Sequence, residues 1–182
     1  MFQMSLSLPD NTRIQHKRNE SILIELTERV LPEERNDFLP LQMIICDHLE
    51  DTNLIHFNVS GFGQKHWPVD VRTDLSTILT QVEDSFIALG EKKNFDLFFY
   101  EQGIERNLQF KWESCIYRVH CQSLSDWEPN PINEYLSHKE IRQQLTDLVN
   151  DFTRATYRVF PNIGDLPAFV DWRCAIGKLL ER

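Results

Sequence analysis

The chain has 182 residues and a formal net charge of -9, with hydrophobic residues at 41% and charged residues at 26%. Its 28 acidic side chains outnumber the 19 basic ones, so it lacks the cationic excess with which proteins bind phosphates, and we expect no nucleic-acid or membrane partner. The length suits a single domain spanning 1–182. The start of the sequence has no long apolar run behind basic residues, and no run approaches about 20 apolar residues, so we expect no secretory signal and a cytoplasmic protein.

The first third of the chain contains three aliphatic runs. Residues 1–20 are polar and mixed, and we expect a flexible arm or a short edge strand there. The run 21–26 is partly β-branched and predicts a strand. The runs 41–46 and 54–59 flank a polar turn, which predicts an antiparallel hairpin. In the latter run, apolar and polar residues alternate, as in a half-buried strand.

A helix is predicted next. Thr73 or Asp74 can cap it, apolar residues recur at helical spacing from Leu75 to Leu89, and Gly90 is suited to its end. A β-meander follows, with strands expected at 95–100, 107–112 and 115–121, because short connections join neighbouring antiparallel strands.

The last third is predicted to be helical. Ser137 and Glu140 form the sequence pattern of a capping box, and apolar residues then recur at steps of four and three up to Val159. Pro161 ends this helix, and Pro167 opens a final one. The order β-β-β-α-β-β-β-α-α predicts an α+β fold: a largely antiparallel sheet of about six strands with three helices packed on it.

Cysteine and histidine spacing gives no sign of catalysis or of a metal site. The four cysteines form no C-x-x-C pair, and Cys115 and Cys121 lie roughly 20 Å apart along one predicted strand, so we expect free, buried thiols. Cys115 and His120 face opposite sides of that strand, which disfavours a thiol nucleophile. The six histidines lack zinc-ligand spacing, and Gly61-Phe62-Gly63 lacks the further residues of a phosphate loop. We therefore expect no metal and no cofactor.

Polar loops supply the candidate contact residues. Asp70 and Asp74 either form a carboxylate pair, or Asp74 caps the helix and Asp70 pairs with Arg72 or faces solvent. Glu101 and Glu105 lie at a predicted hairpin tip, as an acidic contact loop or as exposed ion pairs of little energy. Trp127 lies in a proline-containing loop, where an aromatic side chain either closes the edge of the core or anchors a partner.

In its acidity, its α+β pattern and its lack of catalytic motifs, the chain resembles the small acidic immunity proteins of bacterial toxin–immunity systems. The resemblance implies a non-catalytic protein that neutralises a toxin by covering a basic site on it. The expected contact residues are Asp70, Asp74, Glu101, Glu105 and Trp127. Two alternatives stay open: an enzyme or small-ligand protein that uses Asp70, Asp74 and Arg106, and a structural subunit of a larger assembly. The oligomeric state is not predicted.

Overall fold

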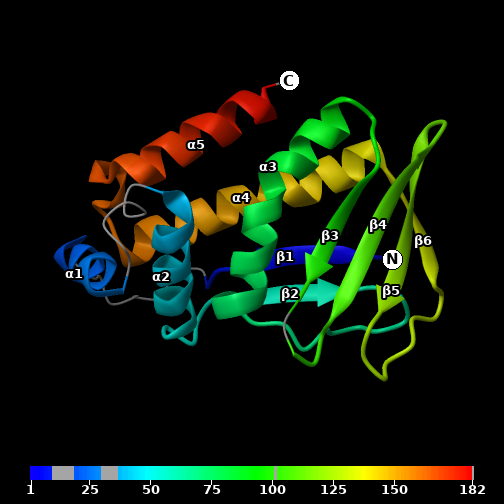
Figure 1. Cartoon of the computed structure of the whole chain (residues 1–182), viewed down its shortest axis with the longest axis horizontal. Coiled ribbons are helices and arrows are strands. Elements are labelled where there is room, and N and C mark those ends of the chain that lie inside the picture. The colour runs from blue at the N-terminus through cyan, green and yellow to red at the C-terminus, as the bar shows by residue number, and fades with distance from the viewer. Residues whose placement is uncertain (10–18, 30–36, 101, 182) are drawn as a thin grey trace.

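In the computed structural model, helices occupy one end of the molecule and a four-stranded sheet occupies the other (Figure 1). The structure describes residues 1–9, 19–29, 37–100 and 102–181. In chain order, its elements are β1 (Gln3–Ser7), α1 (Asn19–Arg29), α2 (Phe38–Glu50), β2 (His56–Ser60), a π-helical turn (Val71–Leu75), α3 (Ser76–Gly90), β3 (Phe95–Phe99), β4 (Arg106–Glu113), β5 (Ile116–Ser123), β6 (Asn133–Ser137), α4 (His138–Val159), a 3-10 turn (Ile163–Asp165) and α5 (Pro167–Leu180).

The α+β class is confirmed, but the predicted single six-stranded sheet with three helices is wrong. The described strands form two separate antiparallel sheets, one with the order β1-β2 and one with the order β3-β4-β5-β6. Five α-helices are described in place of three. Two of the predicted strands are helices, and this difference accounts for most of the disagreement.

The segments 21–26 and 41–46 lie in α1 and α2, so the hairpin predicted between 41–46 and 54–59 does not exist. In α2 the buried residues recur at helical spacing, at Leu41, Ile44, Ile45, His48 and Leu49. This stripe packs into the core, whereas the apolar Met43 between its members is 54% exposed. Burial of one helix face therefore outweighs the strand preference of the β-branched residues.

The strand around residue 57 pairs with the start of the chain instead. β2 lies antiparallel to β1, with Met4 opposite Val59 and Leu6 opposite Phe57. These four side chains are buried, and the alternation predicted for 54–59 is confirmed by the exposed His56 and Asn58. The small sheet thereby joins segments about fifty residues apart.

The predicted meander is present, and one further strand extends it. β3, β4 and β5 are antiparallel neighbours, with Leu97 opposite Leu108 and Phe110 opposite Val119. The unpredicted β6 pairs with β5 and places Leu136 in the core. One face of this sheet is apolar and packs in the same core as the helices, whereas the other carries polar side chains.

Glutamine side chains cover the outer edges of two strands. The amide of Gln81 on α3 donates to the Phe98 carbonyl (3.0 Å) and accepts from the Phe98 backbone N–H (2.8 Å). Gln144 on α4 makes the same kind of pair with β1: its oxygen accepts from the Met4 N–H, and its nitrogen donates to the Phe2 carbonyl. Each glutamine satisfies backbone groups that a neighbouring strand would otherwise satisfy.

The capping box at the start of α4 is confirmed. The Ser137 hydroxyl accepts from the Glu140 N–H, and the Glu140 carboxylate accepts from the Ser137 N–H. These bonds satisfy backbone donors that have no partner within the helix. Among the described helices, none combines the length and the apolar character needed to cross a bilayer.

Candidate binding site

A groove follows the outer side of α2 and the turn that leads into α3; we call it the α2 groove. One end is a hollow of about 450 Å³, which is largely apolar. Its lining residues are Arg29, Leu39, Pro40, Met43, Ile44, Asp47, Arg72 and Thr73. The other end is a polar hollow of about 400 Å³, lined by Glu50, Asp51, Asn53, Asp70 and Arg72. Because Arg72 lines both hollows, an apolar and an acidic surface meet at its side chain.

Backbone hydrogen bonds position Arg72. Asp70 is the N-cap of the π-helical turn, and its carboxylate accepts from the Thr73 N–H (2.7 Å) and the Asp74 N–H (3.2 Å). In return, Asp74 accepts from the Asp70 N–H (3.0 Å). The next residue, Val71, donates its N–H to Glu50 on α2 (2.9 Å). The turn is therefore capped from within and tied to the end of α2, which fixes the backbone on both sides of Arg72.

Ion pairs surround the groove. The Arg72 guanidinium contacts Asp47 (3.2 Å) and Asp51 (2.8 Å). Asp47 also pairs with Arg29 (2.9 Å), which lies 3.7 Å from Glu25 on the same helix. The hydrogen bond that Arg29 donates to Asp47, together with the charge of Glu25, raises the pKa of the Arg29 guanidinium. These pairs lie on the surface, where solvent screens them, so each contributes little to stability.

Negative charge prevails in this region. The carboxylates around the groove are Glu25, Asp47, Glu50, Asp51 and Asp70, whereas the guanidinium groups are those of Arg29 and Arg72. Glu25 also accepts a short bond from His48 (2.7 Å), which ties α1 to α2. An acidic surface beside exposed apolar side chains favours a partner segment that carries both basic and apolar residues.

A second polar feature lies at the start of β4, where Arg106 is enclosed by aromatic rings. Its guanidinium carbon lies 3.5 Å from the centre of the Trp127 ring and 4.1 Å from that of Trp67. One nitrogen donates to Gln64 (2.7 Å), and the side chain is 2% exposed. Desolvation lowers the pKa of Arg106 to about 10. The two indole rings provide cation–π contacts to the guanidinium.

This geometry bears on the enzyme alternative. Arg106 lies between two indole rings, whereas Asp70 and Asp74 accept hydrogen bonds from the backbone of their own turn. Asp74 is 3% exposed. Arg106 is thus held at an edge of the core, whereas Asp70 and Asp74 hold the start of a helix, and these contacts do not join Arg106 to the two carboxylates.

The structure distributes the five predicted contact residues over different surroundings. Asp70 is half-buried and lines the acidic hollow, and Asp74 is enclosed in the turn beneath it. Glu105 is half-buried, with a φ of 44°, and directly precedes Arg106. Trp127 is half-buried and covers Arg106, as expected for an aromatic residue that closes the edge of the core. Glu101 lies outside the described residues.

Sequence reasoning missed most of the α2 groove. The sequence predicts a turn between two strands at Asp47, Glu50 and Asp51, whereas Asp47 and Glu50 lie in α2 and Asp51 is its C-cap, three and four residues after Asp47. This spacing places them on one side of a helix. The helical recurrence of the apolar residues from Leu41 to Leu49 was the signal that could have found them.

The cysteines occupy two kinds of position. Cys46 and Cys121 are buried, as predicted, but Cys115 and Cys174 are exposed. Desolvation raises the pKa of Cys46, and it raises the pKa of Cys121 to about 12, although the charge of Arg106 acts in the opposite direction. The buried thiols therefore stay protonated at neutral pH and are poor nucleophiles. Within the described part of the chain, no group of three or more His, Cys, Asp or Glu side chains could hold a metal ion.

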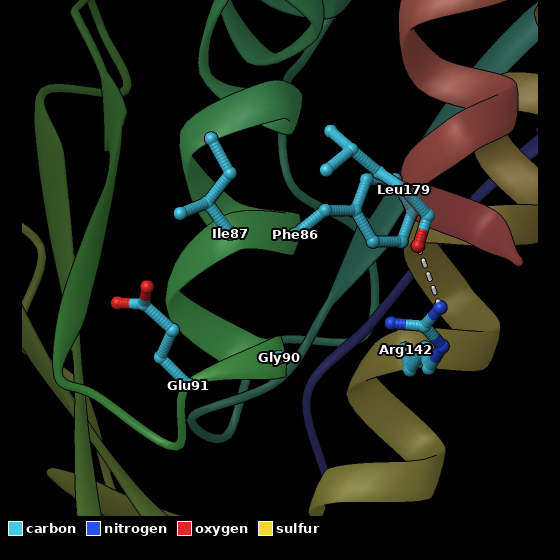
Figure 2. A pocket seen from close by; sticks show the side chains of 6 residues that line it. All are labelled: Phe86, Ile87, Gly90, Glu91, Arg142 and Leu179. Carbon is cyan, nitrogen blue, oxygen red and sulfur yellow. Dashed lines mark hydrogen bonds between the residues drawn. The ribbon is translucent and has the colours of Figure 1, made fainter. Parts of the chain in front are cut away.

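A third hollow lies where α3, α4 and α5 meet (Figure 2). It measures about 190 Å³, less than a typical ligand pocket. Arg142 donates to the carbonyl groups of Leu179 (2.8 Å) and Leu180 (3.0 Å), which end α5. Figure 2 shows Phe86 between α3 and α5, with Ile87 and Glu91 pointing away from Arg142. The polar group in this hollow thus secures a helix end.

The α2 groove therefore combines volume, exposed apolar side chains and an excess of negative over positive side chains. No protein-family model matches the chain, and neither a curated protein nor a solved structure does.

Proposed function

We propose that the chain is a non-catalytic binding protein, of the immunity or inhibitor type, whose α2 groove covers a basic site on a protein partner. The observation that carries this proposal is the junction of the two hollows at Arg72. Leu39 and Met43 are about half exposed beside it, and Asp51 is 56% exposed across the ion pair. Apolar contacts would supply affinity, and the carboxylates would supply orientation and a fast encounter.

The arrangement of the buried ionisable groups supports binding over catalysis. Arg106, Cys46 and Cys121 have strongly displaced pKa values, as catalytic groups often do. However, Arg106 is covered by indole rings and the two thiols are enclosed in the core, and none of these residues lines the described hollows. Their pKa values follow from packing, so they give the enzyme alternative no support.

A growth assay tests the toxin–immunity role. The chain is co-expressed with the protein encoded by the neighbouring gene, and we expect that protein to be toxic alone, harmless in the presence of this chain, and co-purified with it. The variant Glu50→Gln/Asp51→Asn should lose protection, because it removes two groove charges while keeping oxygen acceptors for the backbone. The control Glu83→Gln/Asp84→Asn changes the net charge equally at exposed positions of α3 that do not line the groove, and it should still protect.

Two results would contradict the proposal. Equal protection by both double variants would show that the α2 groove is not the contact surface. A neighbouring product that is harmless and does not co-purify would remove the immunity role.

A further inference from the structure

Arg72 lies at the junction of the two hollows that form the α2 groove. Its guanidinium touches Asp47 and Asp51, and it lines both hollows of the α2 groove. Among the described residues, Arg72 alone is shared by the two linings. Any segment that filled both hollows at once would have to pass over this side chain or move it aside.

The Arg72 side chain can move without disturbing the fold. Its backbone is held by the Asp70 cap and by the bond from Val71 to Glu50, neither of which involves the guanidinium. The side chain itself is 48% exposed. Each exposed ion pair of this kind changes an equilibrium by at most about fivefold, and both pairs of Arg72 are exposed, so a partner cation could replace Arg72 at little cost.

The two carboxylates would respond differently to such a replacement. Asp47 would keep Arg29, which binds its other oxygen at 2.9 Å. Asp51 contacts Arg72 at 2.8 Å and lines the acidic hollow together with Glu50 and Asp70. Asp51 is therefore the carboxylate that an incoming basic side chain would engage.

We propose that Arg72 is an internal stand-in for the basic side chain of the partner, and that a partner segment carrying Lys or Arg beside a bulky apolar residue binds by displacing it from Asp51. This inference rests on the proposed function and adds the chemistry of the occupant. The apolar residue enters the hollow around Leu39 and Met43, and the cation enters the hollow around Glu50, Asp51 and Asp70. Arg72 thereby makes the groove selective for segments that carry a cation, since a segment without one forms no ion pair with Asp51 when it displaces Arg72.

The probe is a short synthetic peptide of alternating Lys and Leu, labelled for fluorescence anisotropy, with a Glu/Leu peptide as the charge control. Replacement of Arg72 by Gln should tighten binding of the Lys/Leu peptide by about three- to fivefold, the range expected for removal of a competing exposed ion pair. Lys111→Gln, on the exposed part of β4, removes the same charge away from the groove and should have a smaller effect. The combined variant Arg72→Gln/Asp51→Asn should lose the gain.

The outcomes separate the two proposals. If the wild type and Asp51→Asn bind the Lys/Leu peptide equally, the groove is not a cation site and the proposed function fails. If Asp51→Asn weakens binding but Arg72→Gln binds no more tightly than Lys111→Gln, the stand-in role is overturned and the proposed function survives.

A measurement on the wild type needs no variant: the Nε–H signal of Arg72 in an NMR spectrum should shift when the peptide binds. An unchanged signal at saturation would also overturn the stand-in role.

Discussion

Replacement of Gln81 should weaken the attachment of the four-stranded sheet to α3. Its amide group makes two hydrogen bonds to the backbone of Phe98 on the outer strand β3, at 2.8 and 3.0 Å. In Gln81→Leu both backbone groups lose their partner while the volume at the site changes little. Gln81→Glu keeps an acceptor for the Phe98 N–H but offers no donor to the Phe98 carbonyl at neutral pH.

The size of the effect follows from these two bonds. Each partly buried hydrogen bond contributes about 0.5–1.5 kcal/mol, so Gln81→Leu should lower the free energy of unfolding by about 1–3 kcal/mol. For a chain of this size, each kcal/mol corresponds to a fall in Tm of about 2–4 °C. Gln81→Glu should cost at least as much at neutral pH, because its carboxylate faces the Phe98 carbonyl oxygen.

Circular dichroism during heating and in urea measures both variants, and the pH dependence of Gln81→Glu supplies the sharper test. The carbonyl should raise the pKa of the introduced carboxyl above its unfolded value of about 4.3. An acid whose pKa is raised by folding gains stability below the unfolded pKa and loses it as the pH rises through the folded pKa. The deficit of Gln81→Glu relative to the wild type should therefore shrink in acid.

The control is Gln143→Leu on α4, whose amide reaches only an exposed Asp147 on the same helix (2.9 Å). This change should stay within about 0.5 kcal/mol of the wild type. A Gln81→Leu variant as stable as Gln143→Leu, or a Gln81→Glu deficit that does not change with pH, would refute the assigned role of the side chain.

Three further predictions concern local packing and titration. Gly63→Ala should destabilise the protein by more than about 2 kcal/mol in urea, because the added Cβ would collide with the Asn130 carbonyl oxygen and because the φ of Gly63 is +86°. Gly177→Ala adds a Cβ that meets no other atom and should stabilise α5 by about 1 kcal/mol. Equal effects of the two variants would contradict this packing. Ser137→Ala should cost about 1 kcal/mol at neutral pH. The Ser137 hydroxyl and N–H lower the pKa of Glu140 below its ordinary value of 4.5. Their contribution to the free energy of unfolding is therefore present above pH 4.5 and is lost as the pH falls through the folded pKa. The difference in unfolding free energy between Ser137→Ala and the wild type should shrink in acid. A thiol reagent at neutral pH should modify Cys115 and Cys174 quickly and Cys46 and Cys121 only upon unfolding; fast labelling of Cys121 would contradict its burial and raised pKa.

The elements that were predicted correctly carry local signals that do not depend on distant contacts. The Ser137 and Glu140 pair defines the start of α4, and it does so through bonds within four residues. The alternation in β4 and β5 is equally local, because each strand buries one face.

The segments that were predicted wrongly contain apolar residues that face in more than one direction. In α1, Ile22 is buried whereas its neighbours Leu23 and Ile24 are about half exposed. In the sequence, Ile22, Leu23 and Ile24 form an uninterrupted apolar run, which favours a strand, although Ile22 alone of these three residues is buried. The strand β6 was missed because it is short, directly follows the loop with Pro129 and Pro131, and carries the polar Glu134 at a buried position.

The start of α3 shows how a cap can be displaced by one turn. Thr73 or Asp74 was predicted to begin the helix, but Asp70 is the cap and a π-helical turn intervenes before Ser76. This extra turn brings Arg72 next to Asp47 and Asp51. The α2 groove thus depends on the π-helical turn and on α2, whose sequence predicts a strand. For this reason Asp70 is the one acidic residue of the groove that the sequence predicts as a contact residue.

The bonds from Gln81 on α3 and Gln144 on α4 to the strands β3 and β1 have a consequence for the behaviour of the protein at high concentration. An uncovered outer strand offers its backbone to any identical strand in solution, and fibril growth begins in this way. Gln81 and Gln144 occupy those backbone groups at Phe98 and at Phe2 and Met4, so a second copy finds no template there. Two side chains on the helices thereby help to keep a β-rich half of the molecule from aggregating.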